Sequence, residues 1–341
     1  MMSKITYILG AGASYGERND KGGIINGMPI VSEIRGCIDF VIKTLKDEYF
    51  DKNIKEDTQI IIDELFWLKK KCEEYPTIDT FAKMLYVTKY KDCGRNYESL
   101  KNAISIFFIL AQKLIHHDLR YDGFIASLID SNGKFPNNLS ILTWNYDCQF
   151  ELAYSGYSRN GRYMPTQWED FDTLIKTFNI NSKSQEAIPL IKINGMVLFW
   201  KEEFRGNSYV KVISDVFFGG DCNTNEKLIK TIRCFLEKKD YYNALSYSWE
   251  GNILFEKQIK EKTKDTTSLV IIGYSFPYVN REIDKKIIQD MEHLRKIYIQ
   301  DPYAEEIRER IYATMNDRQR ESVEIILKDK NFRQFFIPSE L

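Results

Sequence analysis

Short apolar runs recur along the chain, and each is followed at once by small or polar residues. The first run, Ile5-Thr6-Tyr7-Ile8-Leu9, is rich in β-branched and aromatic side chains and leads into a glycine-rich turn. A run with this ending is typical of a buried parallel strand that enters a loop. The same pattern predicts further strands at residues 139–143, 190–193, 269–272 and 297–299.

A different pattern fills the long segment between the first two predicted strands. Its apolar residues recur at spacings of three and four, as in Ile61, Leu65 and Leu68, which predicts amphipathic helices. We therefore expect a mainly helical insertion over residues 31–135. The lysine and glutamate rows within residues 69–74 are typical of solvated helix faces, and we assign them no function.

These elements together predict the fold class. Strands separated by helical segments favour one α/β domain over residues 1–341, a Rossmann-like parallel sheet with helices on both faces and an inserted helical layer. Residues 156–265 mix aromatic, charged and glycine positions, and we interpret them as an irregular α/β insertion. Residues 304–341 begin with a charged helical pattern and end in aromatic residues, so we expect a helical tail that docks onto the body or onto a partner subunit.

Composition narrows the classes of function. A net charge of -1 and a pI near 6.4 give no global basic field, so direct nucleic-acid binding is not expected. The six cysteines form no C-x-x-C pair, which indicates neither a zinc ribbon nor a disulfide framework, and we expect no metal. The apolar runs are too short to cross a bilayer and no secretory signal is visible, so we expect a cytoplasmic protein.

The turn after the first strand has two interpretations that stay open. It reads Gly10-Ala11-Gly12-Ala13-Ser14. The glycines can serve only a tight turn, or they can let backbone N–H groups approach a pyrophosphate at a helix N-terminus. Tyr15 stands where the G-x-G-x-x-G fingerprint has its third glycine, so an ordinary dehydrogenase is disfavoured.

Polar residues also follow the other predicted strands. They lie in Thr143-Trp144-Asn145-Tyr146-Asp147, in Asn194-Gly195, in Gly273-Tyr274-Ser275 and in Gln300-Asp301. In open parallel sheets, ligands bind in the crevice outside the carboxyl ends of the strands, so we expect these groups to converge there. Simpler roles remain open, with Asn145 as a turn residue and Asp147 as a helix N-cap.

The order of these motifs resembles that of SIR2-like (sirtuin-like) proteins. The match is closest to the bacterial branch found in anti-phage defence systems, whose second motif is typically T-x-N-Y-D. The segments that carry the resemblance are residues 10–14, Gly27-Met28-Pro29, residues 143–147, Lys192-Ile193-Asn194-Gly195 and Ile272-Gly273-Tyr274-Ser275-Phe276. They cover a small part of the chain, but their order spans nearly all of it.

The resemblance implies that the chain binds NAD. Gly10, Ala11, Gly12, Ala13 and Ser14 would hold the pyrophosphate. The long loop over residues 17–29, which we expect to be mobile, would bring Pro29 over the nicotinamide end. The remaining contacts would be Asn145 and Asp147 with the nicotinamide ribose and carboxamide, Gly273 and Ser275 with the adenosine half, and Asp301 with the adenine ribose hydroxyls.

One position departs from the family pattern. Active members usually read K-x-H-G in the fourth motif, and this chain has Asn194 in place of the histidine that acts as general base. His116, His117 and His293 are expected at surface or cap positions and do not replace it. An asparagine can orient water but cannot accept its proton at neutral pH.

Three hypotheses follow. The first is an NAD glycohydrolase that releases nicotinamide and ADP-ribose in anti-phage defence, with Asn145 positioning the water, Asp147 in the nicotinamide site and Asn194 assisting. The second is a weak or inactive SIR2-like module that binds NAD or ADP-ribose and regulates a partner, and the third is that the glycines are purely structural. Protein deacetylation is disfavoured, because in the family it relies on the histidine and usually on a zinc module. The resemblance also implies a homo-oligomer or a complex with a second defence component.

Overall fold

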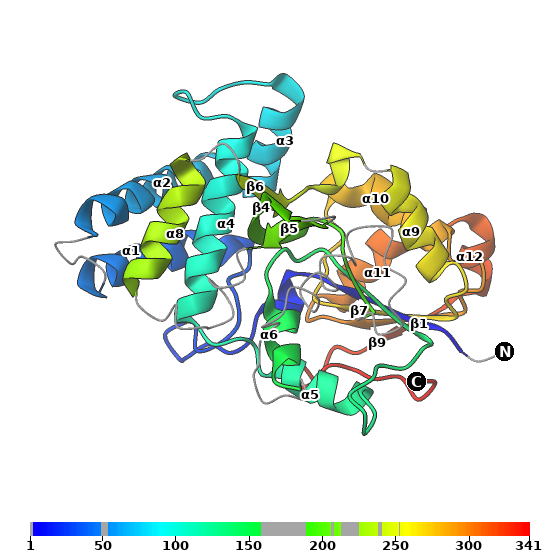
Figure 1. Cartoon of the computed structure of the whole chain (residues 1–341). Helices are drawn as coiled ribbons and strands as arrows, with labels where there is room; N and C mark the ends of the chain where they lie inside the picture. Colours follow the sequence, from blue (N-terminus) through cyan, green and yellow to red (C-terminus); the bar gives the residue numbers. More distant parts are fainter. Residues whose placement is uncertain are drawn as a thin grey trace.

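The computed structural model describes residues 3–48, 54–157, 189–205, 208–212, 225–237, 241–251 and 253–341. Within these ranges the main sheet has six parallel strands in the order β3-β2-β1-β7-β8-β9 (Figure 1). Their bounds are β1 Ile5–Leu9, β2 Leu139–Thr143, β3 Leu190–Lys192, β7 Ser268–Ile272, β8 Lys296–Gln300 and β9 Glu324–Leu327.

The strand order places a topological switch point in the middle of the sheet. From β1 the chain adds β2 and β3 on one side, and it then returns to add β7, β8 and β9 on the other. Leu9 pairs with both Thr143 and Ile272, so the three central strands end at the same level. The turns that follow β1, β2 and β7 therefore begin side by side, where Rossmann-like sheets bind ligands.

Helices pack on both faces of this sheet, because successive strand residues point to opposite sides. Ile8, Leu142 and Ile271 contact one hydrophobic cluster, and Tyr7, Ile141 and Val270 contact another. The first cluster is completed by α9 Ile253–Thr263, α10 Arg281–Gln289 and α11 Ala304–Tyr312, and the second by α5 Arg120–Leu128 and α6 Gln149–Ser155. The predicted α/β class with a parallel sheet and helices on both faces is confirmed.

A block of helices follows β1 and has a hydrophobic core of its own. It contains α1 Ile34–Glu48, α2 Lys55–Glu74, α3 Ile78–Thr88 and α4 Tyr97–Leu114, and it is joined by α8 Asn225–Glu237. Figure 1 shows these helices beside the sheet, with the antiparallel strands β5 Ser208–Val212, β4 Gly195–Arg205 and β6 Tyr241–Leu245 next to α4. None of the described helices is both long enough and apolar enough to cross a membrane.

The five strands expected from the sequence are all present, within one residue of the expected bounds. The tail over residues 304–341 differs from the expected helical tail, because α11 and α12 Asp317–Ser322 are followed by the edge strand β9. In the expected irregular insertion over 156–265, residues 158–188, 206–207, 213–224, 238–240 and 252 lie outside the described ranges.

Candidate functional site

The turn after β1 lies in direct contact with the turn after β7. The amide of Gly10 donates to the carbonyl of Ile272 at 3.0 Å, and the amide of Gly12 donates to that of Gly273 at 2.9 Å. A Cβ on Gly12 would lie 2.7 Å from the Cα of Gly273, and Gly273 itself has φ +61°. Only glycine permits this approach, since a side chain at either position would overlap backbone atoms.

The same hydrogen bonds determine which backbone amides of the glycine-rich turn already have partners within the protein. Besides Gly10 and Gly12, Ala13 also donates its amide within the protein, to the carbonyl of Gly10 at 2.8 Å. Ala11 is exposed and Gly12 is half-buried, so the tip of the turn faces solvent. The structural role of the glycines is therefore present in this fold, and these three amides already have partners within the protein.

Asn145 ties the turn after β2 to the turn after β1. Its backbone amide donates to Thr143 Oγ1 at 3.0 Å, and its Nδ2 donates to the carbonyl of Gly10 at 2.8 Å and to Ser14 Oγ at 3.0 Å. The side-chain Oδ1 has no hydrogen-bond partner among the described residues. Asn145 is thus a cross-turn brace whose carbonyl oxygen can still accept a bond from a ligand.

Asp147 is buried beside Ser14, with 6 % of its surface exposed. Its Oδ1 accepts the amide of Gln149, the first residue of α6, at 3.1 Å, as in an Asx turn, whereas the N-cap position of α6 is Cys148 and not Asp147. Burial raises the pKa of Asp147, while the nearby ammonium group of Lys192 and a hydrogen bond with Ser14 oppose the rise. The carboxyl group therefore belongs to the same hydrogen-bonded cluster as Asn145.

Lys192 supports this cluster from β3. Its Nζ donates to the carbonyl of Asp147 and lies 2.8 Å from Glu151 Oε1, and both side chains of this ion pair are almost fully buried. Buried ion pairs hold geometry but leave a costly unpaired charge when one partner is removed. Lys192 is therefore a positioning residue for the turn that carries Asn145 and Asp147.

Asn194 has a bracing role as well. Its Nδ2 donates to the carbonyl of Trp144 at 3.2 Å, and its Oδ1 accepts the amide of Ser248 at 3.2 Å. Both ends of the carboxamide are occupied, and only 6 % of the residue is exposed. In this arrangement the side chain links the β2 turn to the segment before α9 and keeps one N–H and one lone pair beyond these two bonds.

Other predicted residues lie around this cluster. Ser275 is exposed, and the amide of Gly273 reaches the carbonyl of Gln300 at 3.1 Å, which places Asp301 at the next strand end. Asp301 accepts the amide of Tyr303 at 2.8 Å, and burial raises its pKa. Among the histidines, His116 and His293 are exposed, and His117 pairs with Asp122 at 2.8 Å.

The loop that carries Pro29 is more firmly held than the mobile loop expected from its composition. Arg18 donates to the carbonyls of Asn26 and Met28 at 3.2 and 3.0 Å and pairs with Glu33 at 2.7 Å. The amide of Met28 donates to the carbonyl of Ser14 at 2.6 Å, and Pro29 is buried. The loop is thus packed against the β1 turn.

Sequence reasoning missed several residues that shape the site. Arg120 Nη2 donates to the carbonyls of Gly12 and Ala13 at 3.0 and 3.3 Å and pairs with Asp118 at 2.6 Å. The hydroxyl of Tyr121 lies 3.2 Å from Ser14 Oγ. The signal in the sequence is the acidic and basic pair Asp118 and Arg120 after a predicted helix, which does not reveal the distant partners of Arg120 and Tyr121.

Comparisons with known protein families and with curated proteins identify no relative of this chain. No protein-family model matches the chain, and no curated protein sequence matches it. In the described part of the chain, no three histidine, cysteine or acidic residues lie close enough together to hold a metal ion.

Proposed function

We propose that the protein is SIR2-like and binds NAD or ADP-ribose across the turns after β1, β2 and β7. The observation that carries this proposal is the contact of Gly12 with Gly273 and of Asn145 with Gly10 at the switch point of the sheet. Three turns far apart in the chain meet where open parallel sheets receive nucleotides. The solvent-facing tip of the glycine turn and the Oδ1 of Asn145 fit a pyrophosphate and a ribose hydroxyl.

For the reaction, we propose slow NAD glycohydrolysis. The leaving nicotinamide already carries a positive charge, so positioning and electrostatic stabilisation can do much of the work. Asn145 offers an acceptor for water or ribose, and Asp147 is a buried carboxyl group in the same cluster. General acid–base help is worth about 10² to 10⁴ in rate, and Asn194 does not supply it, because an amide cannot accept a proton at neutral pH.

A second candidate is favoured by the contacts of Asn194. Because this side chain braces two backbone segments, the fold also suits a module that holds NAD or ADP-ribose without turnover and regulates a partner. Following the resemblance, we propose a cytoplasmic role in anti-phage defence, as a homo-oligomer or with a second component. We also propose that α1 to α4 form the inserted helical layer.

Calorimetric titration with NAD and with ADP-ribose tests binding, and chromatography of nicotinamide tests turnover. Binding of both nucleotides with release of nicotinamide over hours supports the glycohydrolase, and binding without release supports the regulatory module. Asn145→Ala should weaken nucleotide binding, whereas Asn137→Ala, at an exposed position in the turn before β2, is a matched control. If neither nucleotide binds or raises the melting temperature, the glycine turn is purely structural.

A further inference from the structure

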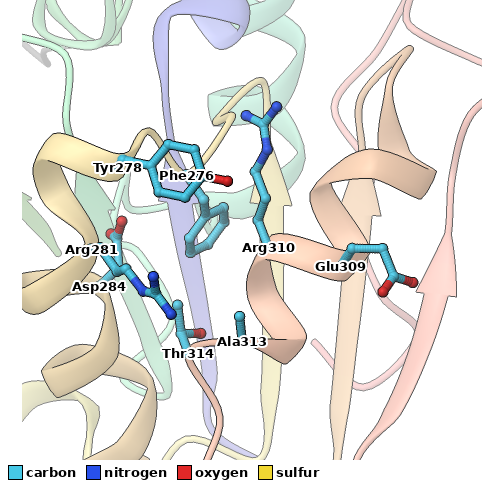
Figure 2. Close-up of a pocket in the computed structure, with 8 residues that line it drawn as sticks. All are labelled: Phe276, Tyr278, Arg281, Asp284, Glu309, Arg310, Ala313 and Thr314. Carbon is cyan, nitrogen blue, oxygen red and sulfur yellow. The ribbon is translucent and has the colours of Figure 1, made fainter.

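A separate cavity of about 250 Å³ lies between the start of α10 and the second half of α11. Figure 2 shows Tyr278 and Phe276 on one side of this cavity, with Arg281 extending toward Thr314 and Arg310 rising from α11. The cavity is smaller than the range of about 300 to 1,000 Å³ typical of small-molecule sites. Its size therefore suits a ligand smaller than a dinucleotide.

The aromatic side of the cavity is held in a strained backbone conformation. Phe276 has φ +51°, which is uncommon for any residue other than glycine, and it precedes Pro277. Its ring is buried and lies 4.7 Å from the ring of Tyr274, whereas Tyr278 is 80 % exposed. Strain of this kind gathers at binding sites, and here it presents one fixed ring and one free ring to the cavity.

Two guanidinium groups supply positive charge. Arg281 makes no ion pair or hydrogen bond with the residues that the structure describes, and it begins α10, where the helix dipole favours an anion. Arg310 donates to the carbonyl of Ser275 at 2.7 Å and lies 3.8 Å from Glu306. Glu309 extends away from the other labelled side chains in Figure 2 and lies 3.5 Å from Arg308.

Asp284 supplies a polar group that is almost fully buried, with 1 % of its surface exposed. The hydroxyl of Tyr274 lies 3.1 and 2.9 Å from its two carboxyl oxygens. Burial raises the pKa of Asp284 to about 8, so the group is mostly protonated at neutral pH and adds little negative charge to the cavity. A protonated carboxyl group can both donate and accept a hydrogen bond, as the edge of a nucleobase requires.

We propose that this cavity is a second ligand site, which binds a nucleoside monophosphate with its base against Phe276 and Tyr278 and its phosphate at the guanidinium group of Arg281. Aromatic rings stack on any base, and arginine is well suited to bind phosphate. The site is distinct from the edge that carries Gly12 and Asn145. Arg310 connects the cavity to that edge, because its guanidinium group donates a hydrogen bond to the carbonyl of Ser275 in the turn after β7.

The test is a titration of the full chain with AMP in the presence of saturating ADP-ribose. We expect AMP to bind in a saturable manner and ADP-ribose not to displace it. Adenosine and inorganic phosphate alone should each bind at least about tenfold more weakly than AMP, since each lacks one half of the contacts. No binding of AMP at millimolar concentration, displacement by ADP-ribose, or equal binding of phosphate would each overturn the proposal.

Arg281→Ala separates this site from the dinucleotide site. The residue is exposed, so its removal should leave the fold intact and weaken AMP binding by about tenfold or more. Arg308→Ala is the matched control, because Arg308 is a surface arginine of α11 that pairs with Glu305 at 2.8 Å. Equal weakening by both variants refutes the assignment. If ADP-ribose does not bind, only the proposal for the dinucleotide site fails. The comparison of AMP binding by Arg281→Ala and Arg308→Ala still tests the second site, because it does not require ADP-ribose to bind.

Discussion

Replacement of Asp284 by asparagine should change how the stability of the protein depends on pH. Burial raises the pKa of Asp284 in the folded chain from its ordinary value of 3.8 to about 8. The asparagine has the same shape and can still accept a bond from the hydroxyl of Tyr274, but it cannot ionise. The substitution therefore removes one titration and leaves the packing of α10 nearly unchanged.

The direction in which the free energy of unfolding changes with pH depends on whether the folded or the unfolded chain binds the proton of Asp284. Between about pH 5 and about pH 7 the unfolded chain has lost this proton and the folded chain keeps it, so the free energy of unfolding falls by roughly 1.4 kcal/mol per pH unit. Over that window the loss due to Asp284 is on the order of 3 kcal/mol. Its stabilising effect is greatest below the unfolded pKa and is lost as the pH rises toward the folded one.

Urea unfolding at three pH values in this window measures the effect. The wild-type protein should lose more stability than Asp284→Asn as the pH rises, by at least about 1 kcal/mol after allowance for relaxation around the buried group. Asp20→Asn, in an exposed turn, should follow the wild type. Parallel curves for wild type and Asp284→Asn would show that the carboxyl group is ionised in the folded chain, and the reasoning about its burial would fail.

Three further substitutions test the site. Gly273→Ala should destabilise the protein and abolish nucleotide binding, because its Cβ would lie 2.3 Å from the amide nitrogen of Ala13. Gly22 has a similar φ but open space around it, so Gly22→Ala should lower the free energy of unfolding, measured by thermal unfolding, by only about 1 kcal/mol. Lys192→Met should lower the free energy of unfolding by about 3 to 5 kcal/mol, since it leaves Glu151 buried and unpaired, and a double variant with Glu151→Leu should recover much of the loss. Asn194→His should raise nicotinamide release at least about tenfold, because it restores a proton acceptor, and an unchanged rate would argue for the regulatory module.

The sheet could be predicted from sequence because each central strand is a short, fully buried apolar run. Residues 5–9 and 139–143 were located to the residue, since both ends of each run are marked by an abrupt change to polar or small residues. Strand β9 was missed because it lies at the edge of the sheet. None of its residues is fully buried, so its pattern lacks the continuous apolar signal of the central strands.

The candidate site was predictable only in part. The strand-end rule placed Gly12, Asn145 and Gly273 at one edge, and the structure brings these residues together. The rule could not reveal that Asn194 uses both ends of its side chain, or that Arg120 reaches the carbonyl of Gly12. Such bonds depend on the relative placement of distant backbone segments, which no local pattern encodes.

The contact between the β1 and β7 turns has a consequence for synthesis of the chain. Gly12 and Gly273 meet only after most of the polypeptide has left the ribosome, since Gly273 lies far along the sequence. A nascent or truncated product that ends before β7 has only the turns after β1 and β2, without the β7 turn that packs against them, and no switch point. Incomplete copies of the chain therefore cannot assemble the edge where the three turns meet.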